Sequence, residues 1–220
     1  MNKKSVHHVE IFAAEGFVTV QKFISIYPFQ LVAERNGVGV KQWLVCCSST
    51  EIIRFVFTQI DNPDEVVKDT YSVQWWKYEQ EQSISEDLSI KQRSVSSVFN
   101  ISLEINDVKS FYTRLSHRGL KLLKDVQSVD DENGYVQFFV VKSIVGNVTH
   151  TIIDSRNYHG LFLPGFSPVS SSLLSHEHHN RENRISHFDH FTFACHVGDS
   201  GKIIDWYENN FKMKRLFINR

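Results

Sequence analysis

The feature that most constrains the fold of this chain is a pattern of secondary structure that its sequence repeats three times. Segments of alternating apolar and polar residues, which are typical of half-buried strands, open the three units at 6–12, 98–105 and 188–195. A helix is predicted after each of them, because apolar residues then recur three and four positions apart. The first two units continue with three further apolar runs, so each consists of a strand, a helix and three strands. The third continues only to a short apolar run at 216–218.

The local sequence also predicts where these elements begin and end. Asn106 or Asp107 is expected to cap the second helix, which Gly119 ends, and Asp199 or Ser200 is expected to cap the third. The remaining strands of the first unit are predicted at 29–33, 42–47 and 52–57, and those of the second at 120–126, 135–141 and 148–153.

A unit of this kind buries its sheet only by pairing with a second copy. Two paired units predict an α+β fold in which a curved mixed sheet surrounds a cavity and the helices lie outside it. We expect one complete domain at 1–160, made of two βαβββ units, and a linker rich in serine and histidine at 161–184. Residues 185–220 are then the start of a second domain, and the polar segment 61–93 is a long excursion between the first two units.

Composition excludes several classes of protein. The chain has 24 Lys and Arg against 25 Asp and Glu, whereas a nucleic-acid-binding protein would carry a strong positive excess. No apolar run approaches the roughly 20 residues of a membrane-spanning helix. The polar start Met1-Asn2-Lys3-Lys4 does not lead into the apolar core of a secretion signal. We therefore expect a protein that is not secreted and has no membrane span.

The 3 cysteines of the chain are too few for a disulfide framework. Cys46 and Cys47 are adjacent in an apolar run, where strand alternation points them to opposite faces, and Cys195 stands alone. We expect all three to be small core residues in a reducing compartment rather than reactive thiols. The pair Trp75-Trp76 is likewise more typical of a core or an interface than of a cofactor site.

His190 is the candidate metal ligand of the chain. Alternation along 188–195 places its imidazole and the Thr192 hydroxyl on one face of the predicted strand, and Phe191 and Phe193 on the other. An imidazole on a wet interior face can bind iron, zinc, copper or nickel. The pattern alone also fits an ordinary histidine that is satisfied by hydrogen bonds, and this is the simpler interpretation.

The other histidines are weaker candidates. His187 lies at the mouth of the predicted strand, and the cluster at 176–179 falls in the linker and does not follow the HExxH pattern of helical zinc sites. His8 is the counterpart of His190 in the first unit, and Asn100 is the counterpart in the second. Catalytic residues stay unassigned, because the sequence has neither a glycine-rich phosphate loop nor a GxSxG motif.

The most specific stretch of the chain is 149–166, with the sequence THTIIDSRNYHGLFLPGF. It resembles the segment that closes the first domain of 4-hydroxyphenylpyruvate dioxygenases, where a Tyr-x-Gly-x-Phe-Leu-Pro-Gly-Phe motif precedes the interdomain linker. The segment ISHFDH at 185–190 resembles the Asp-His that opens the catalytic domain of this family. The continuations FSPVSS at 166–171 and DHFTFAC at 189–195 are closer still to the animal branch of dioxygenase-like proteins. The resemblance implies the vicinal-oxygen-chelate superfamily, whose glyoxalase-like fold is built from paired βαβββ modules.

The resemblance also implies a cofactor and a substrate class. In that family a non-haem Fe(2+) is held by two His and one Glu and binds an aromatic α-keto acid and O2 in its open positions. The keto acid is decarboxylated and hydroxylated, and whether the product is homogentisate or a hydroxymandelate stays open here. His190 matches the first iron ligand, whereas the second His and the Glu belong to modules beyond Arg220. The 220-residue chain alone is therefore predicted to be inactive.

Two alternatives remain open. A catalytically silent binding or interaction module could keep the paired-unit fold without a metal, and another member of the superfamily, such as a glyoxalase or an extradiol dioxygenase, would lack the Phe-Leu-Pro-Gly-Phe motif. The resemblance further implies that the first domain is a non-catalytic scaffold and the partner in a homodimer. It implies a cytoplasmic location through tyrosine catabolism, or a mitochondrial one through the dioxygenase-like branch. The few residues ahead of the first strand favour the cytoplasm.

Overall fold

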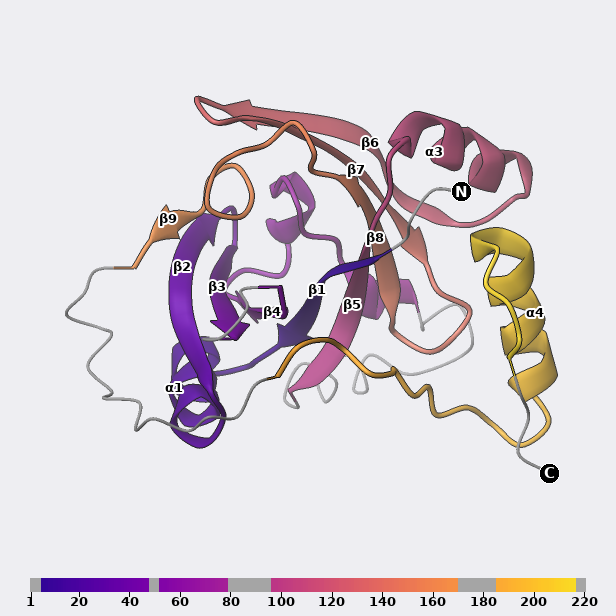
Figure 1. Cartoon of the computed structure of the whole chain (residues 1–220), viewed down its shortest axis with the longest axis horizontal. Coiled ribbons are helices and arrows are strands. Elements are labelled where there is room, and N and C mark those ends of the chain that lie inside the picture. The colour runs from indigo at the N-terminus through magenta and orange to yellow at the C-terminus, as the bar shows by residue number, and fades with distance from the viewer. Residues whose placement is uncertain (1–4, 48–51, 79–95, 170–184, 217–220) are drawn as a thin grey trace.

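The computed structural model describes residues 5–47, 52–78, 96–169 and 185–216. In this part of the chain the strands form a single mixed sheet with the order β6-β7-β8-β5-β1-β4-β3-β2-β9. The sheet curls around an interior without closing, an arrangement that we call the first barrel, and the α-helices lie on its outer face (Figure 1). This arrangement confirms the α+β fold with a curved mixed sheet that the repeated pattern predicts. None of the helices in the described part of the chain combines the length and the apolar character that crossing a membrane requires.

The first unit is confirmed as a strand, a helix and three strands. Its elements are β1 (Ser5–Phe12), α1 (Gly16–Ile26), β2 (Phe29–Gly37), β3 (Val40–Cys47) and β4 (Arg54–Ile60). Strands β2, β3 and β4 pair antiparallel in chain order, and β4 then pairs parallel with β1. Val20 and Ile24 of α1 are buried against the sheet, as expected from their spacing of four residues.

The second unit repeats this topology. Its elements are β5 (Ser97–Glu104), α3 (Val108–His117), β6 (Leu122–Asp131), β7 (Gly134–Lys142) and β8 (Thr149–Asp154). Strands β6, β7 and β8 pair antiparallel in chain order, and β8 pairs parallel with β5. The Asp107 carboxylate accepts a hydrogen bond from the Ser110 backbone N–H over 3.0 Å, which caps α3, and Gly119 follows the helix with a φ of 71°. Both helix boundaries are as the sequence predicts.

Strand β6 extends five residues further than the sequence indicates, to Asp131 instead of residue 126. The polar residues at its end face solvent on an edge strand, so no apolar alternation marks them. Gly134 makes the tight turn into β7 with a φ of 119°, and a Cβ there would lie 2.0 Å from the Asn157 backbone oxygen. Only glycine fits this turn.

The two units meet at the centre of the sheet, where β1 and β5 pair antiparallel. Residues from both units fill the interior, and separate outer clusters lie beneath α1 and beneath α3. Cys46 belongs to the interior cluster and Cys47 to the cluster beneath α1, which confirms that these neighbours point to opposite faces. Burial on both faces explains why β3 is apolar along most of its length.

Part of the predicted excursion enters the interior of the barrel. It contains two short 3-10 helices, η1 (Val66–Lys68) and η2 (Trp75–Tyr78). The Trp75 and Trp76 side chains are buried there, so the interpretation of this pair as core residues is confirmed. Residues 79–93 of the excursion lie outside the described residues.

The first residues of the predicted linker pack against the first barrel. Phe162, Leu163 and Phe166 are buried in its interior, and strand β9 (Ser167–Pro168) pairs antiparallel with β2. The rest of the linker, 170–184, lies outside the described residues. The division into domains at 1–160 and 185–220 stays a prediction.

In the third unit the helix is confirmed and the strand is not. Helix α4 (Ser200–Phe211) follows Asp199, but residues 185–199 contain no strand, so the strand predicted at 188–195 is wrong for this structure. A strand needs a neighbour for its backbone hydrogen bonds, and no described strand pairs with this segment. Its aromatic rings pack on the first barrel instead, with Phe188 5.5 Å from Phe55 between ring centroids. Only Leu216 of the short run at 216–218 lies in the described chain.

Candidate functional site

His190, the candidate iron ligand, lies on the irregular segment that precedes α4. Its side chain is 74% exposed, and its Nδ1 lies 2.8 Å from a carboxylate oxygen of Asp189, which is itself 86% exposed. His190 and Thr192 are exposed while Phe191 and Phe193 are half-buried, so the predicted alternation holds over 190–193 but not at Phe188, Asp189 or Cys195. The imidazole is therefore accessible from solvent and has one carboxylate beside it.

These donors do not form an iron site by themselves. A facial iron site needs two imidazoles and a carboxylate directed at one point, whereas His190 and Asp189 are sequence neighbours bonded to each other. Within the described ranges, no three His, Cys, Asp or Glu side chains are placed to hold a metal ion. The described residues thus do not fit Fe(II) without further ligands, and the role of His190 stays a prediction.

The remaining histidines divide into exposed and buried groups. His187 is exposed, and its Nδ1 lies 2.8 Å from the Ser186 hydroxyl, while the cluster at 176–179 lies outside the described residues. His7 and His8 are buried on β1 with their Nδ1 atoms 2.8 Å apart. Burial lowers the pKa of both imidazoles, that of His8 to about 3, so both rings are neutral and the Nδ1–H of one donates a hydrogen bond to the Nδ1 of the other.

Cys195 is exposed, so its prediction as a core residue is wrong. Cys46 and Cys47 are buried, as predicted. The predicted strand does not form, and Cys195 lies on the irregular segment, where the described elements leave it exposed.

The interior of the barrel holds a polar cluster centred on Glu10. We call it the Glu10 cluster, and its members are Glu10, Gln42, Thr58, Asn100 and Thr151. Gln42 Nε2 and the Thr58 hydroxyl donate to Glu10 Oε1 over 2.8 and 2.5 Å. Asn100 Nδ2 donates to Glu10 Oε2 over 3.0 Å and to Thr151 Oγ1 over 2.8 Å. The cluster thereby joins both units across the β1–β5 pair, in which Glu10 stands opposite Asn100.

A buried ion pair extends this network. Two nitrogens of Arg35 donate to the two carboxylate oxygens of Asp69 over 2.9 and 2.8 Å, and Arg35 Nε donates to Gln42 Oε1 over 2.7 Å. Burial raises the pKa of Asp69, but the Arg35 hydrogen bonds and charge outweigh it and hold this pKa below its ordinary value. At Glu10 burial is the stronger effect, so its pKa is raised in spite of three side-chain hydrogen bonds. The hydrogen bonds to the Glu10 and Asp69 carboxyl groups replace bonds that these groups would make to water in the unfolded chain.

The interior is closed around this network. A cavity of about 20 Å³ remains beside Glu10 and Asn100, which is room for about one water molecule. His8 also lines it, so the structure brings together the residues that correspond to His190 in the first two units. Trp75 stacks on Phe99 with 5.1 Å between ring centroids and fills the rest of the space. The barrel interior is a packed core rather than a ligand chamber, so the expectation that the curved sheet surrounds a cavity is wrong for the described residues.

Sequence reasoning missed most of the Glu10 cluster. Each member is a polar residue within an apolar strand, and a polar residue at such a position indicates a buried hydrogen-bond partner. Alternation assigns a residue to a face of its own strand, but it does not say which residues of another strand stand opposite. The pairing of Glu10 with Asn100 depends on the register of two strands that are 90 residues apart.

Relatives of the chain are found among curated proteins. A 4-hydroxyphenylpyruvate dioxygenase-like protein of Rattus norvegicus is 32% identical over 116 residues, which make up 53% of this chain and 29% of the rat protein. A 4-hydroxyphenylpyruvate dioxygenase of Aspergillus fumigatus is 27% identical over 127 residues, covering 54% of this chain and 30% of that protein. The curated homologues of this chain are thus named 4-hydroxyphenylpyruvate dioxygenase or dioxygenase-like protein. The chain covers less than a third of the length of these two relatives.

The fold has a known counterpart as well. A triple mutant of 4-hydroxymandelate synthase from Streptomyces coelicolor matches with a TM-score of 0.52 and 12% identity, over 73% of this chain and 50% of that chain. At this identity the likeness shows the fold alone, which is the vicinal-oxygen-chelate fold that the resemblance implies. No protein-family model matches the chain.

Proposed function

We propose that this chain is part of a 4-hydroxyphenylpyruvate dioxygenase-like oxygenase that uses Fe(II) and O2 on an aromatic α-keto acid. The observation that carries the proposal is the match to relatives named dioxygenase or dioxygenase-like, over about half of the chain. A facial Fe(II) site would supply adjacent positions at which the keto acid and O2 bind to one ion.

Within this proposal His190 is the first iron ligand. It is exposed, and its Nδ1 lies beside the Asp189 carboxylate, so Nε2 would be the nitrogen left to bind iron. The second His and the Glu would come from further sequence. A single imidazole competes poorly with water for Fe(II), so the 220-residue chain alone should not turn over substrate.

The first domain, 1–160, would then be a scaffold. The closed interior and the mutually satisfied Glu10 cluster support this assignment, since they leave room for about one water molecule. We place the protein in the cytoplasm and expect it to form a homodimer through this domain.

A second candidate is a catalytically silent module of the same fold. The specific observation in its favour is that the described residues contain no three-ligand metal cluster while the first barrel is a complete core. It would bind no iron even in the natural, intact protein.

The test compares iron content and O2 uptake with 4-hydroxyphenylpyruvate for the 220-residue chain and for the protein made from its full natural coding sequence. We expect iron and substrate-dependent O2 uptake in the natural protein and neither in the chain alone. His190→Ala in the natural protein should abolish both, and the matched control His187→Ala, on the same exposed segment, should retain both. A natural protein that folds without iron and consumes no O2 would contradict the proposal and favour the silent module.

A further inference from the structure

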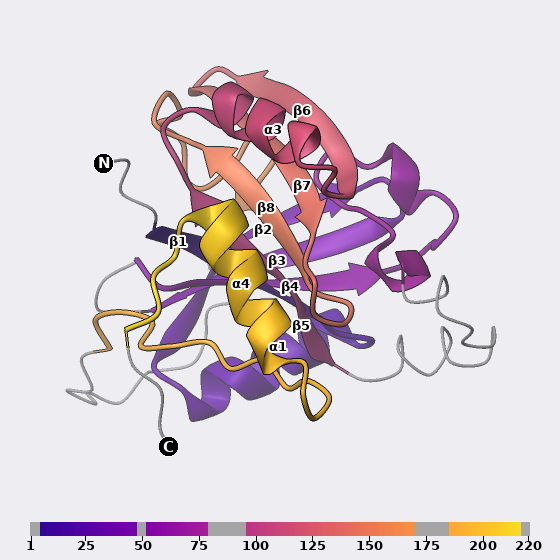
Figure 2. The same cartoon turned by 90° about the vertical axis from the view of Figure 1, so that its right-hand side faces the viewer.

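Helix α4 borders two cavities outside the first barrel. Figure 2 shows this helix lying across the outer face of the sheet. The cavity beneath α4 has a volume of about 460 Å³. Another, of about 520 Å³, lies among the end of α3, the start of β6, the end of β7 and α4. We call it the basic cavity, after Arg118, Lys121 and Lys142, which line it. Both volumes fall in the range of roughly 300–1,000 Å³ that is typical of small-molecule sites.

The cavity beneath α4 does not single out a class of ligand. His150 Nδ1 lies 3.0 Å from the Ile101 carbonyl oxygen, which can only accept, so Nδ1 carries the proton. Nε2 then accepts from the Tyr207 hydroxyl over 2.9 Å, and the Tyr207 oxygen accepts from the Ser143 hydroxyl over 3.0 Å. The polar groups of this wall therefore satisfy one another. Its charged lining residues carry both signs and include Glu208, which lies 3.9 Å from Arg215.

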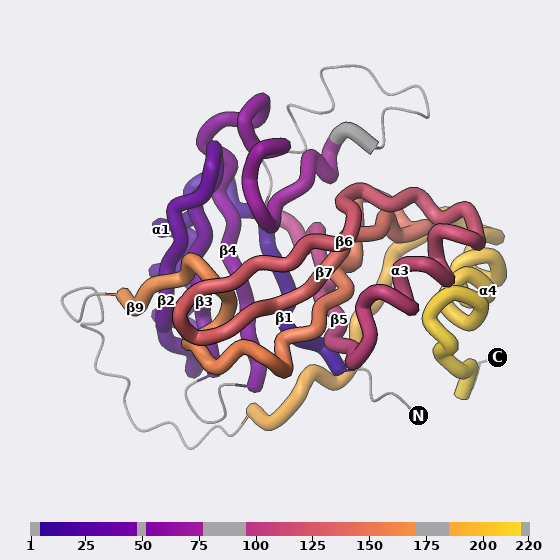
Figure 3. The backbone as a smooth tube through the Cα atoms, turned by 90° about the horizontal axis from the view of Figure 1, so that it is seen from above, coloured from indigo at the N-terminus to yellow at the C-terminus, as the bar shows by residue number. Residues whose placement is uncertain are grey.

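The walls of the basic cavity are held in place by contacts between α3 and α4. Arg114 and Arg118 donate to the backbone carbonyls of Asn210 and Asn209 over 2.8 and 3.0 Å, which satisfies the end of α4. Phe211, at the same end of α4, is fully buried. Figure 3 shows α3 and α4 side by side at this end of the molecule. The cavity is thus formed by the fold without a ligand.

Two lysines of the basic cavity lie next to each other on neighbouring strand ends. The Lys142 backbone N–H donates to the Lys121 carbonyl oxygen over 3.0 Å. The Lys142 ammonium donates to the carbonyl oxygens of Ser143 and Gly146 over 3.3 and 3.2 Å, and these acceptors are uncharged. Like charges that stand opposite each other on adjacent strands repel. None of the described residues that line the basic cavity is acidic.

The guanidinium of Arg118 adds to this positive charge. Its hydrogen bonds to the described residues end on the Asn209 carbonyl oxygen and on Asn210 Oδ1, which are neutral. Burial, and after it the charge of Arg118, lower the pKa of Arg114, so two guanidinium groups are close here. The ends of α3 and α4 each contribute only about half of a negative charge. The chain as a whole has a net charge of -1, so the excess of positive charge is local to this cavity.

A phosphate group fits this arrangement better than a carboxylate does. A phosphate monoester carries a charge of about −1.5 to −2 near neutral pH and offers three strong acceptor oxygens, so it can pair with several cations at once. Arginine and lysine are the side chains that proteins use for phosphate. The rest of the wall includes the apolar side chains of Leu120, Ile144 and Trp206, which suit an organic group attached to the phosphate.

We propose that the basic cavity binds a small phosphate monoester, with its phosphate at the three basic side chains and its organic group against the apolar part of the wall. A bound phosphate relieves the repulsion among these cations. The site is separate from the proposed iron function, because His190 does not line the cavity. The proposal therefore stands or falls without the dioxygenase activity.

The test is calorimetric titration of the 220-residue chain with butyl phosphate, pentanoate and inorganic phosphate. Pentanoate keeps the alkyl chain and replaces the phosphate by a carboxylate, whereas inorganic phosphate lacks the alkyl chain. We expect butyl phosphate to bind with a dissociation constant of about 1 mM or tighter, and both other probes to bind at least about fivefold more weakly. Absence of butyl phosphate binding, or equal binding of either other probe, would overturn the proposal.

The position of the site is tested by Lys121→Glu, at an exposed residue where loss of folding is not expected. It places a negative charge in the basic cavity and should weaken butyl phosphate more than about tenfold. The matched control Lys109→Glu makes the same change of charge at the other, exposed end of α3 and should alter binding less than about twofold. Thermal unfolding checks that each variant folds. If Lys121→Glu does not fold, Lys142→Gln, which should weaken binding about fivefold, decides the outcome. Equal weakening by the variant and by its control would overturn the proposal.

Discussion

The interior of the first barrel and the cavity beneath α4 are both bordered by aromatic rings, yet the first has about 20 Å³ of free space and the second about 460 Å³. Both units build the interior, and their polar residues are bonded across the β1–β5 pair. The cavity beneath α4 is built from one face of the sheet, one helix and an irregular segment. The contrast teaches that side chains of the paired units fill the interior, so that the larger cavities of the described residues lie outside it.

The largest expected effect is the loss of stability on breaking the buried Arg35–Asp69 ion pair, which tests whether the interior is a closed core. Asp69→Ala leaves the buried Arg35 guanidinium without its carboxylate and removes an acceptor for the backbone N–H groups of Val38, Tyr71 and Ser72. We expect the free energy of unfolding in urea to fall by about 3–5 kcal/mol. The matched control Asp61→Ala breaks an exposed pair with Lys41 and should cost less than about 1 kcal/mol. Equal losses would mean that the interior is not a closed core.

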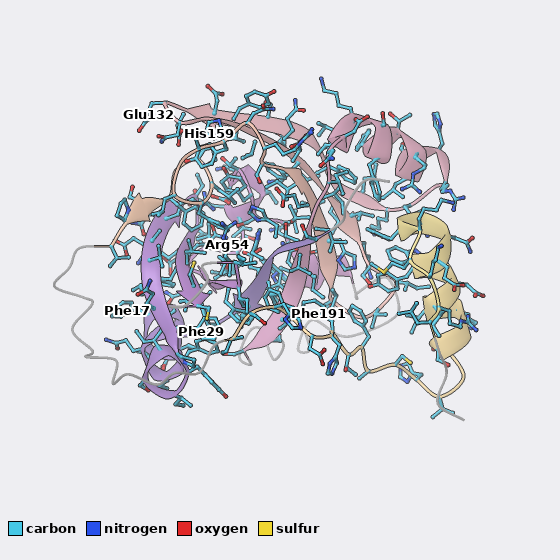
Figure 4. All side chains as sticks on the ribbon, in the orientation of Figure 1. Phe17, Phe29, Arg54, Glu132, His159 and Phe191 are labelled. Carbon is cyan, nitrogen blue, oxygen red and sulfur yellow. The ribbon has the colours of Figure 1, made fainter. Side chains whose placement is uncertain are left out.

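The next effect concerns the centre of the Glu10 cluster. Glu10→Gln replaces one acceptor by an N–H donor that faces the donors of Gln42, Thr58 or Asn100. We expect a loss of about 1–3 kcal/mol in urea unfolding. Glu132→Gln, in the exposed turn after β6 that Figure 4 labels, should change stability by less than about 0.5 kcal/mol. A Glu10→Gln variant as stable as the parent would show that the network does not hold the units together.

Stability should also fall as the solution is acidified. Burial lowers the pKa of His7, His8 and His150, so below the ordinary value of 6.5 the unfolded chain binds more protons than the folded one. Their contribution is complete above pH 6.5 and declines by up to about 1.4 kcal/mol per pH unit for each histidine, towards the folded pKa of about 3 for His8 and about 4 for His150. The raised pKa of Glu10 acts in the opposite sense as the pH falls through it.

The measurement is urea unfolding between about pH 7 and pH 5 for the parent chain and for His150→Asn. The variant should show a shallower decline, because one of the buried histidines is gone. A parent protein whose stability is flat over this range would contradict the buried, neutral state of these rings.

A smaller effect sharpens the description of the cavity wall. Tyr207→Phe removes the donor to His150 Nε2 and the acceptor of Ser143. We expect a loss of about 1 kcal/mol in thermal or urea unfolding, together with a change in the fluorescence of the neighbouring Trp206. Tyr135→Phe, at an exposed hydroxyl that accepts from Asn157, should alter neither. If both variants behave alike, α4 is not held by this chain of hydrogen bonds.

The last prediction concerns the cysteines, for which we expect a small change in stability and a clear difference in thiol reactivity. Cys195 is exposed whereas Cys46 and Cys47 are buried on opposite faces of β3. A thiol reagent should modify Cys195 at once in the native protein and the other two only after denaturation. Cys195→Ser should leave stability within about 0.5 kcal/mol and remove the fast reaction. Three equally fast thiols would contradict the burial of β3.

The sequence predicts the paired units because their elements are defined by local spacing. Alternation marks β1 and β5, and the intervals between Val20 and Ile24 or between Val108 and Leu115 mark the buried stripes of α1 and α3. The strand at 188–195 has the same alternation and does not form. Alternation shows that a segment can be a strand, but only a neighbouring strand makes it one.

The candidate site is predictable only in part, because local sequence does not show which distant residues become its neighbours. His190 stands out through its place in the repeat and through the resemblance of 185–190, but the other ligands of an iron site have to come from distant sequence. The Glu10 cluster and the cavity beneath α4 depend on register and on how α4 packs, neither of which a single-chain pattern contains.

The most direct test of the account is the intact mass and iron content of the protein isolated from its natural source. We predict a mass well above 25.6 kDa and bound iron, since the chain covers less than a third of the relatives that it matches and its described residues do not complete an iron site. A stable, iron-free protein of 25.6 kDa would contradict the account. His190 would then have no metal to hold, and the silent module would be the better description.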